Sequence, residues 1–161
     1  MPLLQWSDEM ALGPTSMDHT HREFIDLLAQ VVQAPDADLL TQWHVLVDHT
    51  EEHFAREDRW MKDTGFASSN CHTVHHEAVL QVMREGERRA ELAVVRQMAE
   101  ELGTWFPIHA QAMDAPLAQH LIAVGYDTLT GQVTRPQALP AEEIHGCSND
   151  ACAPTTQATT V

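Results

Sequence analysis

The chain has 161 residues, of which 24 are acidic and 9 are basic, for a formal net charge of −15. This length suits one domain with its own hydrophobic core. The negative charge repels phosphate backbones and anionic lipids, so neither nucleic acid nor a membrane surface is an expected partner. No apolar run approaches the roughly 20 residues that span a bilayer, and the N-terminus has no signal-peptide pattern. Three cysteines are too few for a disulfide framework, so the expected location is the cytoplasm.

The N-terminal part predicts an irregular arm followed by a helix. Gly13-Pro14 is a pair that breaks regular structure, and residues 1–17 are expected to be irregular. From Asp18 onward, Phe24 follows His21 at helical spacing, which places His21 on a buried face. A histidine in such a position is more often a hydrogen-bonded core residue than a metal ligand, so His21 by itself indicates little.

The second helix has the clearest periodicity in the chain, and it carries two polar residues within its apolar stripe. Pro35 ends the first helix, and the acidic residues after it cap the second. His53 and Glu57 lie four residues apart among large apolar side chains, so they share the buried face. A buried carboxylate without a partner is strongly unfavourable, so Glu57 requires a cation or a proton. His49, one turn before His53, is better explained as a supporting or exposed residue.

The third helix supplies a second pair at the same spacing. Gly65 is expected to end the second helix, and Ser68-Ser69-Asn70 offers side chains that can cap the next one, predicted from about residue 69 to 87. His72 and His76 lie four residues apart on its apolar side. Two helices joined by a short loop run antiparallel, so both pairs are expected at a similar depth in a bundle.

The fourth helix is predicted to begin near Ala90 and to continue past residue 120, with His109 on its buried line. Asp114 follows five residues later, about 140° round an ideal helix, so it would reach the same centre only from the flank. That position would suit a bridging carboxylate, but a solvated surface acid is equally compatible with the spacing. Pro107 and Pro116 each remove a backbone donor and are expected to bend the helix.

The composition changes after Tyr126. Residues 127–161 are rich in Thr, Ala, Pro and Gln, which predicts a flexible C-terminal tail. The tail carries Cys147 and Cys152 near His145, for which an inert segment is a better explanation than a small metal or redox site. The predicted fold is all-α: an antiparallel up-down four-helix bundle over residues 1–126, with an irregular N-terminal arm and this C-terminal tail.

Five buried imidazoles and two carboxylates are too many for one tetrahedral zinc ion. They fit two metal ions that can each accept six ligands, bridged by the carboxylates and with one position left open. Imidazole suits iron, copper, nickel or zinc, and bridging carboxylates favour iron. The Glu-x-x-His sites of di-iron oxidases are not found on a buried stripe here. The residues of the pattern are, in order, Asp18-His19-Thr20-His21; His53-Phe54 with Glu57; His72 with His76; and Trp105 with His109 and Asp114.

This ordered set resembles the hemerythrin pattern over about residues 6–125, and the single domain with an added tail looks like a bacterial member. The resemblance implies a non-haem di-iron centre with an oxo or hydroxo bridge that binds dioxygen reversibly. One iron would take His72, His76 and His109. The other would take His21 and His53 and keep the open position. Glu57 and Asp114 would bridge the two.

The resemblance implies an oxygen-binding protein for storage, delivery or sensing more than an enzyme. The alternatives are a di-iron peroxidase or nitric oxide reductase that uses the same open position, or an iron-handling protein. A protein acceptor of the oxygen is not predicted. Four residues depart from the family's pattern without removing a ligand, and one of them, Pro107, is unexpected in this helix. His49 stands where tyrosine is frequent, while Phe106 and Ala110 stand where bulky aliphatic residues are usual, which predicts a partly open pocket.

Overall fold

The computed structural model describes residues 3–66 and 71–144. The predicted cap at Ser68-Ser69-Asn70 and the tail residues His145, Cys147 and Cys152 lie outside the described residues.

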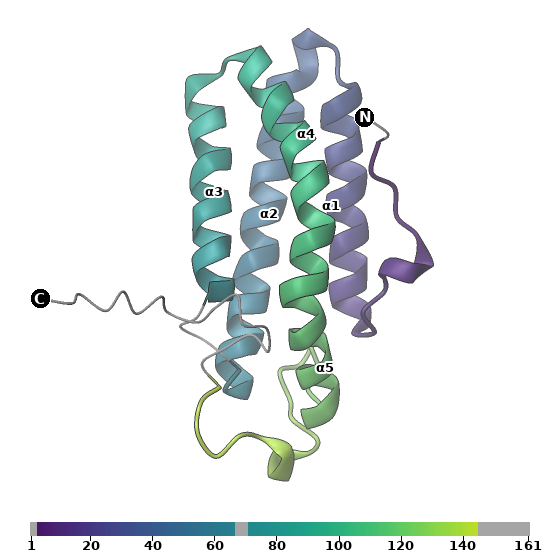
Figure 1. The fold of residues 1–161 in the computed structure, drawn as a ribbon, viewed down its shortest axis with the longest axis vertical. Coiled ribbons are helices and arrows are strands. Elements are labelled where there is room, and N and C mark those ends of the chain that lie inside the picture. The colour runs from purple at the N-terminus through teal and green to yellow at the C-terminus, as the bar shows by residue number, and fades with distance from the viewer. Residues whose placement is uncertain (1–2, 67–70, 145–161) are drawn as a thin grey trace, which may run out of the picture.

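Four long helices run side by side and antiparallel (Figure 1). They are α1 (Thr15–Gln33), α2 (Asp36–Thr64), α3 (Cys71–Arg89) and α4 (Leu92–His109). The last one continues through a π-helical turn, η2 (Ala110–Asp114), into α5 (Ala115–Val124). Both α1 and α3 pack against α2 and α4. The prediction of an all-α, antiparallel four-helix bundle is confirmed.

The helix ends lie within a few residues of the prediction, since α3 ends at Arg89 rather than near 87 and α4 begins at Leu92 rather than near Ala90. Helix α1 begins at Thr15, before the predicted start at Asp18, and the Asp18 carboxylate accepts hydrogen bonds from the backbone N–H of Leu12 (2.6 Å) and Gly13 (3.1 Å). Asp18 therefore ties the preceding arm to the first turn from inside the helix. Gly65 ends α2 in the left-handed conformation, at φ +66°, where a side chain would be strained.

The core consists of two apolar clusters at different heights in the bundle. The first is near the α1–α2 connection, and the second is near the end of α2. Trp43 and Phe24 are among the largest members of the first, and Trp60 and Leu117 belong to the second. On α2 the two clusters are separated by a layer that contains His53 and Glu57. The bundle therefore buries a polar layer between two apolar ones.

Segments outside the helices cover the sides and one end of the bundle. In the N-terminal arm, which includes the short 3-10 helix η1 (Asp8–Met10), Trp6 packs against the first cluster under the guanidinium of Arg22, 5.0 Å from its ring centre. Residues 127–144, with η3 (Pro136–Ala138), pass below the bundle (Figure 1). There the N–H of Ile144 donates to the carbonyl of Gly65 at 2.9 Å. The division of the chain at residue 126 stays a prediction.

Within residues 3–66 and 71–144, no helix combines the length and the apolar character needed to cross a membrane.

Candidate metal centre

The polar layer contains all seven residues that the sequence predicts as metal ligands. None of them is more than 2% exposed. Their side chains come from α1, α2, α3, α4 and η2, and they point toward a common centre. The seven are His21, His53, Glu57, His72, His76, His109 and Asp114.

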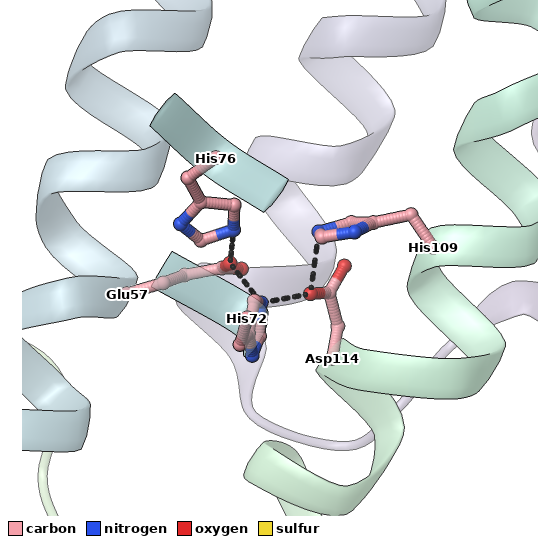
Figure 2. Close-up of side chains that lie close together, drawn as sticks. All are labelled: Glu57, His72, His76, His109 and Asp114. Atoms are coloured by element: carbon pink, nitrogen blue, oxygen red, sulfur yellow. Dashed lines mark ion pairs between the residues drawn. The ribbon is translucent and has the colours of Figure 1, made fainter. Parts of the chain in front are cut away.

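The two i, i+4 pairs face each other across the α2–α3 contact, as the antiparallel arrangement predicts. On α2, Nε2 of His53 lies 3.1 Å from Oε1 of Glu57. The other carboxylate oxygen of Glu57 lies 3.4 Å from Nε2 of His76 and 3.6 Å from Nε2 of His72 (Figure 2). Spacing on two separate helices has thus produced one three-dimensional cluster.

The π-helical turn brings Asp114 into the centre. The N–H of Ala115 donates to the carbonyl of Ala110, five residues earlier, which is the hydrogen bond of a π-helix. This turn absorbs one extra residue, so residues five apart lie on the same face. As a result, Oδ1 of Asp114 lies 3.1 Å from Nε2 of His109 and 3.0 Å from Nε2 of His72 (Figure 2). Asp114 is fully buried, not a solvated acid, and the approach from the flank of an ideal helix is not needed.

Each carboxylate directs its two oxygens toward different histidines. Oε1 of Glu57 faces His53 and His21, the latter at 3.5 Å, while Oε2 faces His72 and His76. Asp114 divides its oxygens in the same way, because Oδ2 lies 3.3 Å from His21 while Oδ1 faces His72 and His109.

This division separates the centre into two groups that could each hold a metal ion. We call His21 and His53 the two-histidine half, and His72, His76 and His109 the three-histidine half. Glu57 belongs to both groups. Asp114 groups with the three-histidine half and also reaches His21.

The inward-facing atoms fit a metal better than they fit one another. Among the described residues, Nε2 of His21, His76 and His109 and both Asp114 oxygens have no hydrogen-bond partner. They nevertheless face opposing ligand-type atoms at 3.0 to 3.4 Å. Two atoms about 2.1 Å from one metal ion, at right angles, are about 3 Å apart. The geometry is therefore that of atoms directed at an ion between them.

The charges of the site also favour cations. Burial acts against the charged imidazole of His21, but the carboxylates of Asp114 and Glu57 outweigh it and raise its pKa from 6.5 to about 10. The same balance raises the pKa of His72 to about 9. Burial opposes ionisation of Glu57 and Asp114, yet the surrounding histidines hold the pKa of each carboxyl well below its usual range. A metal that binds here must displace protons from the imidazoles, so uptake should release protons.

Aromatic rings surround the imidazoles. The Trp105 ring stacks on His109 with centroids 4.5 Å apart, and Phe54 stacks on His76 at 3.9 Å. On the opposite side, Phe106 meets the ring of His21 edge-on at 5.2 Å. The site is thus shielded from water by rings that also restrict how the imidazoles rotate.

Two further residues lie close to this set. Nε2 of His49 lies 3.3 Å from the Thr20 carbonyl, with its ring centroid 6.2 Å from that of His53, and burial lowers the pKa of His49. His49 belongs to neither group of possible ligands among the described residues. Asp58 was not singled out from the sequence, yet its Oδ1 lies 2.9 Å from Nδ1 of His76. In the sequence, the one feature that could have drawn attention to Asp58 is its position directly after Glu57.

A four-helix bundle with a buried layer of imidazoles and carboxylates defines a metal-binding bundle protein. The pattern of the hemerythrin HHE cation-binding domain matches residues 13–121, a range that includes all seven residues. This chain belongs to the hemerythrin family, for which non-haem iron is the implied metal.

Curated relatives agree with the family assignment. The chain is 37% identical to a bacteriohemerythrin of Ralstonia nicotianae, over 79% of this chain and 95% of the relative. It is 31% identical to a bacteriohemerythrin of Pseudomonas paraeruginosa, over 71% of this chain and 79% of the relative. A bacteriohemerythrin of Stenotrophomonas maltophilia is 26% identical over 76% of this chain. No solved structure matches the chain significantly.

Proposed function

We propose that this protein binds dioxygen reversibly at a non-haem di-iron centre held by the seven buried residues. The observation that carries the proposal is the division of the carboxylate oxygens, because Glu57 and Asp114 each face both halves of the site. A carboxylate in that position suits a bridge between two ions. The oxo or hydroxo bridge between the irons is part of the same proposal.

The chain's own residues would set how the iron behaves. Bound iron supplies the redox-active position at which dioxygen can attach. The three-histidine half offers one more imidazole than the two-histidine half, so an open position would fall to the two-histidine half. Five neutral imidazoles contribute no negative charge, and Glu57 and Asp114 contribute only two carboxylates. Such a site stabilises high-valent iron less than a carboxylate-rich one does, which favours binding dioxygen over splitting it.

Apolar side chains keep water away from the proposed open position. Phe106 is 1% exposed, stacks on Phe24 with centroids 4.6 Å apart, and lies against the ring of His21. An apolar wall limits the entry of water and anions, which would otherwise shorten the lifetime of bound dioxygen. Storage, delivery or sensing of oxygen is the physiological role that belongs to this proposal.

The proposal is tested by loading the metal-free protein with ferrous iron without oxygen. Metal analysis should return two irons per chain, and the optical spectrum should change on exposure to air and return when oxygen is removed. A single metal per chain, or zinc alone from cells supplied with ample iron, would contradict the di-iron site. Rapid turnover with peroxide or nitric oxide would instead support an enzyme, and easy loss of iron to a chelator would support an iron-handling protein.

A further inference from the structure

One imidazole of the three-histidine half is held from behind by a carboxylate. His76 directs Nε2 into the centre, 3.4 Å from Glu57, while its Nδ1 faces Oδ1 of Asp58 at 2.9 Å. The hydroxyl of Thr73 lies 3.5 Å from the same Asp58 oxygen. Asp58 comes from α2, and both of its partners come from α3, so the contact spans the interface between these helices.

This contact distinguishes His76 from other imidazoles of the centre. In residues 3–66 and 71–144, Nδ1 of His53 and Nδ1 of His109 are buried without a hydrogen-bond partner. The Asp58 side chain is 36% exposed, whereas His76 is 1% exposed. A carboxylate at the protein surface is thus linked to the buried site through one imidazole ring.

The direction of this hydrogen bond has a chemical consequence. A carboxylate accepts a proton donated by Nδ1–H, which leaves the lone pair of the neutral ring on Nε2, the atom that faces the centre. Such a partner fixes the tautomer and orientation of a ligating histidine and makes it a stronger donor. Stronger donation stabilises the more oxidised metal and therefore lowers its reduction potential.

We propose that Asp58 is a positioning residue that locks His76 with Nε2 toward the metal and makes the three-histidine half the more electron-rich of the two. The inference rests on the proposed iron site. It assigns to Asp58 a role in iron retention and in redox potential that its place on a half-exposed turn of α2 does not suggest.

The test compares Asp58→Asn and Asp58→Ala with the unchanged full-length protein. Asparagine keeps the size of the side chain and can still accept the proton through its amide oxygen, but it removes the charge. Alanine removes the acceptor. We expect iron loss to a chelator to be about 10- to 100-fold faster for Asp58→Ala and less affected for Asp58→Asn. The midpoint potential of the iron should rise in both variants.

Asp48→Asn is the matched control. Asp48 also lies on α2, carries the same charge and is 63% exposed, but its ion-pair partner is His44 rather than a residue of the centre. This control should leave both the potential and iron retention unchanged. If the midpoint potential of Asp48→Asn shifted as much as that of Asp58→Asn, only the overall charge would matter, and the proposal would be overturned. The proposal would also be overturned if the Asp58 variants lost thermal stability but kept the wild-type midpoint potential. In that case the Asp58–His76 contact would only connect α2 to α3.

A second measurement does not depend on iron. In protein loaded with zinc, which is diamagnetic, nitrogen-15 NMR should show His76 protonated at Nδ1, with slow exchange of that proton. Asp58→Ala should speed the exchange. Unchanged exchange would overturn the hydrogen bond itself. If the wild-type protein takes up zinc but no iron, the proposed function fails while this measurement still decides the role of Asp58.

Discussion

The two halves of the site differ in how the protein supports their imidazoles. In the three-histidine half, His76 is stacked on Phe54 and bonded to Asp58, and His109 is stacked on Trp105. In the two-histidine half, His21 meets the edge of Phe106, and the ring of His53 is tilted against that of Phe54 at 5.3 Å. Stacking and the hydrogen bond to Asp58 therefore restrict the orientations of His76 and His109. Among the described residues the two-histidine half has ring contacts only at an angle, so its imidazoles are less firmly held, which suits the open position proposed for this half.

The largest expected effect comes from the residue that both halves share. Glu57→Ala removes a proposed bridge and a negative charge that offsets two dications, so we expect loss of at least one iron per chain. His49→Ala removes a side chain from outside both groups of ligands and should cost about 10- to 100-fold in affinity or activity at most. Metal analysis of both variants measures how many irons each chain keeps. The assignment of α2 would be wrong if Glu57→Ala kept both irons while His49→Ala lost them.

A proton in each half should make the metal-free protein sensitive to pH. The pKa of His21, in one half, is raised from 6.5 to about 10, and that of His72, in the other, to about 9. These protons stabilise the metal-free fold fully below about pH 6.5, and their contribution is lost as the pH rises through 9 and 10. The unfolding temperature of metal-free protein should thus fall over this range.

The ionised carboxylates of Glu57 and Asp114 explain the sign, because they lose their counter-charges when the imidazoles deprotonate. Bound metal replaces those protons, so metal-loaded protein is the control and should show a smaller change between pH 6.5 and 10. A metal-free unfolding temperature that stays constant or rises would refute the description of the site as proton-filled.

Replacing one aromatic ring beside each half tests which half has the open position. Phe106→Leu loosens the wall beside His21, so the oxygenated form should decay several-fold faster than in wild type. Trp105→Leu alters the ring stacked on His109 and should change that decay less. Either substitution should lower the free energy of unfolding by less than the ~3–5 kcal/mol that is typical when a buried Phe or Trp is replaced by Ala. The measurement is the decay of the oxygenated spectrum in one buffer. If the oxygenated form decayed faster in Trp105→Leu than in Phe106→Leu, the open position would lie in the three-histidine half, against the proposal.

Ala110 offers the reverse change. It is 6% exposed and lies in η2, next to His109. The partly open pocket predicted from the sequence has not been tested, and Ala110→Ile tests it by adding bulk. Slower decay than wild type is expected if open space remains beside this residue. Decay as fast as wild type or faster would indicate that the Phe106 ring already fills it.

The smallest effect is expected at the C-terminal end, which as far as residue 144 contributes to neither half. A chain ending at residue 144 should keep its iron and its unfolding temperature. A chain ending at 126 should keep its iron, because no residue of the centre lies beyond Asp114. It should nevertheless unfold at a lower temperature, since it loses the bond from Ile144 to Gly65 and that from the Arg135 side chain to the Ile122 carbonyl. Loss of iron from either chain would assign the tail a role at the site.

The features that sequence analysis predicts well are those with a local cause. Apolar periodicity located the helices, and the i, i+4 spacing of His53 with Glu57 placed both on one face. The π-helical turn has no such signature, because it depends on Asp114 being drawn into the buried layer. The Asp58–His76 contact depends on how closely α2 and α3 approach, which side-chain packing decides. The bonds of residues 127–144 to the bundle were likewise invisible, since they join the backbone of Gly65 to a segment without periodicity.

The extra residue in η2 also sets the rotational phase of everything after it. Leu117 lies eight residues beyond His109, which on an unbroken α-helix would turn it about 80° away. With one residue absorbed by the π-helical turn, the pair behaves as if seven apart, about 20° from a common line. Leu117 is fully buried in the second apolar cluster as a result. The single extra residue therefore rotates the rest of the helix by about one residue. Because of this rotation, one continuous helix directs Asp114 into the polar layer and still packs its last turns against the second apolar cluster.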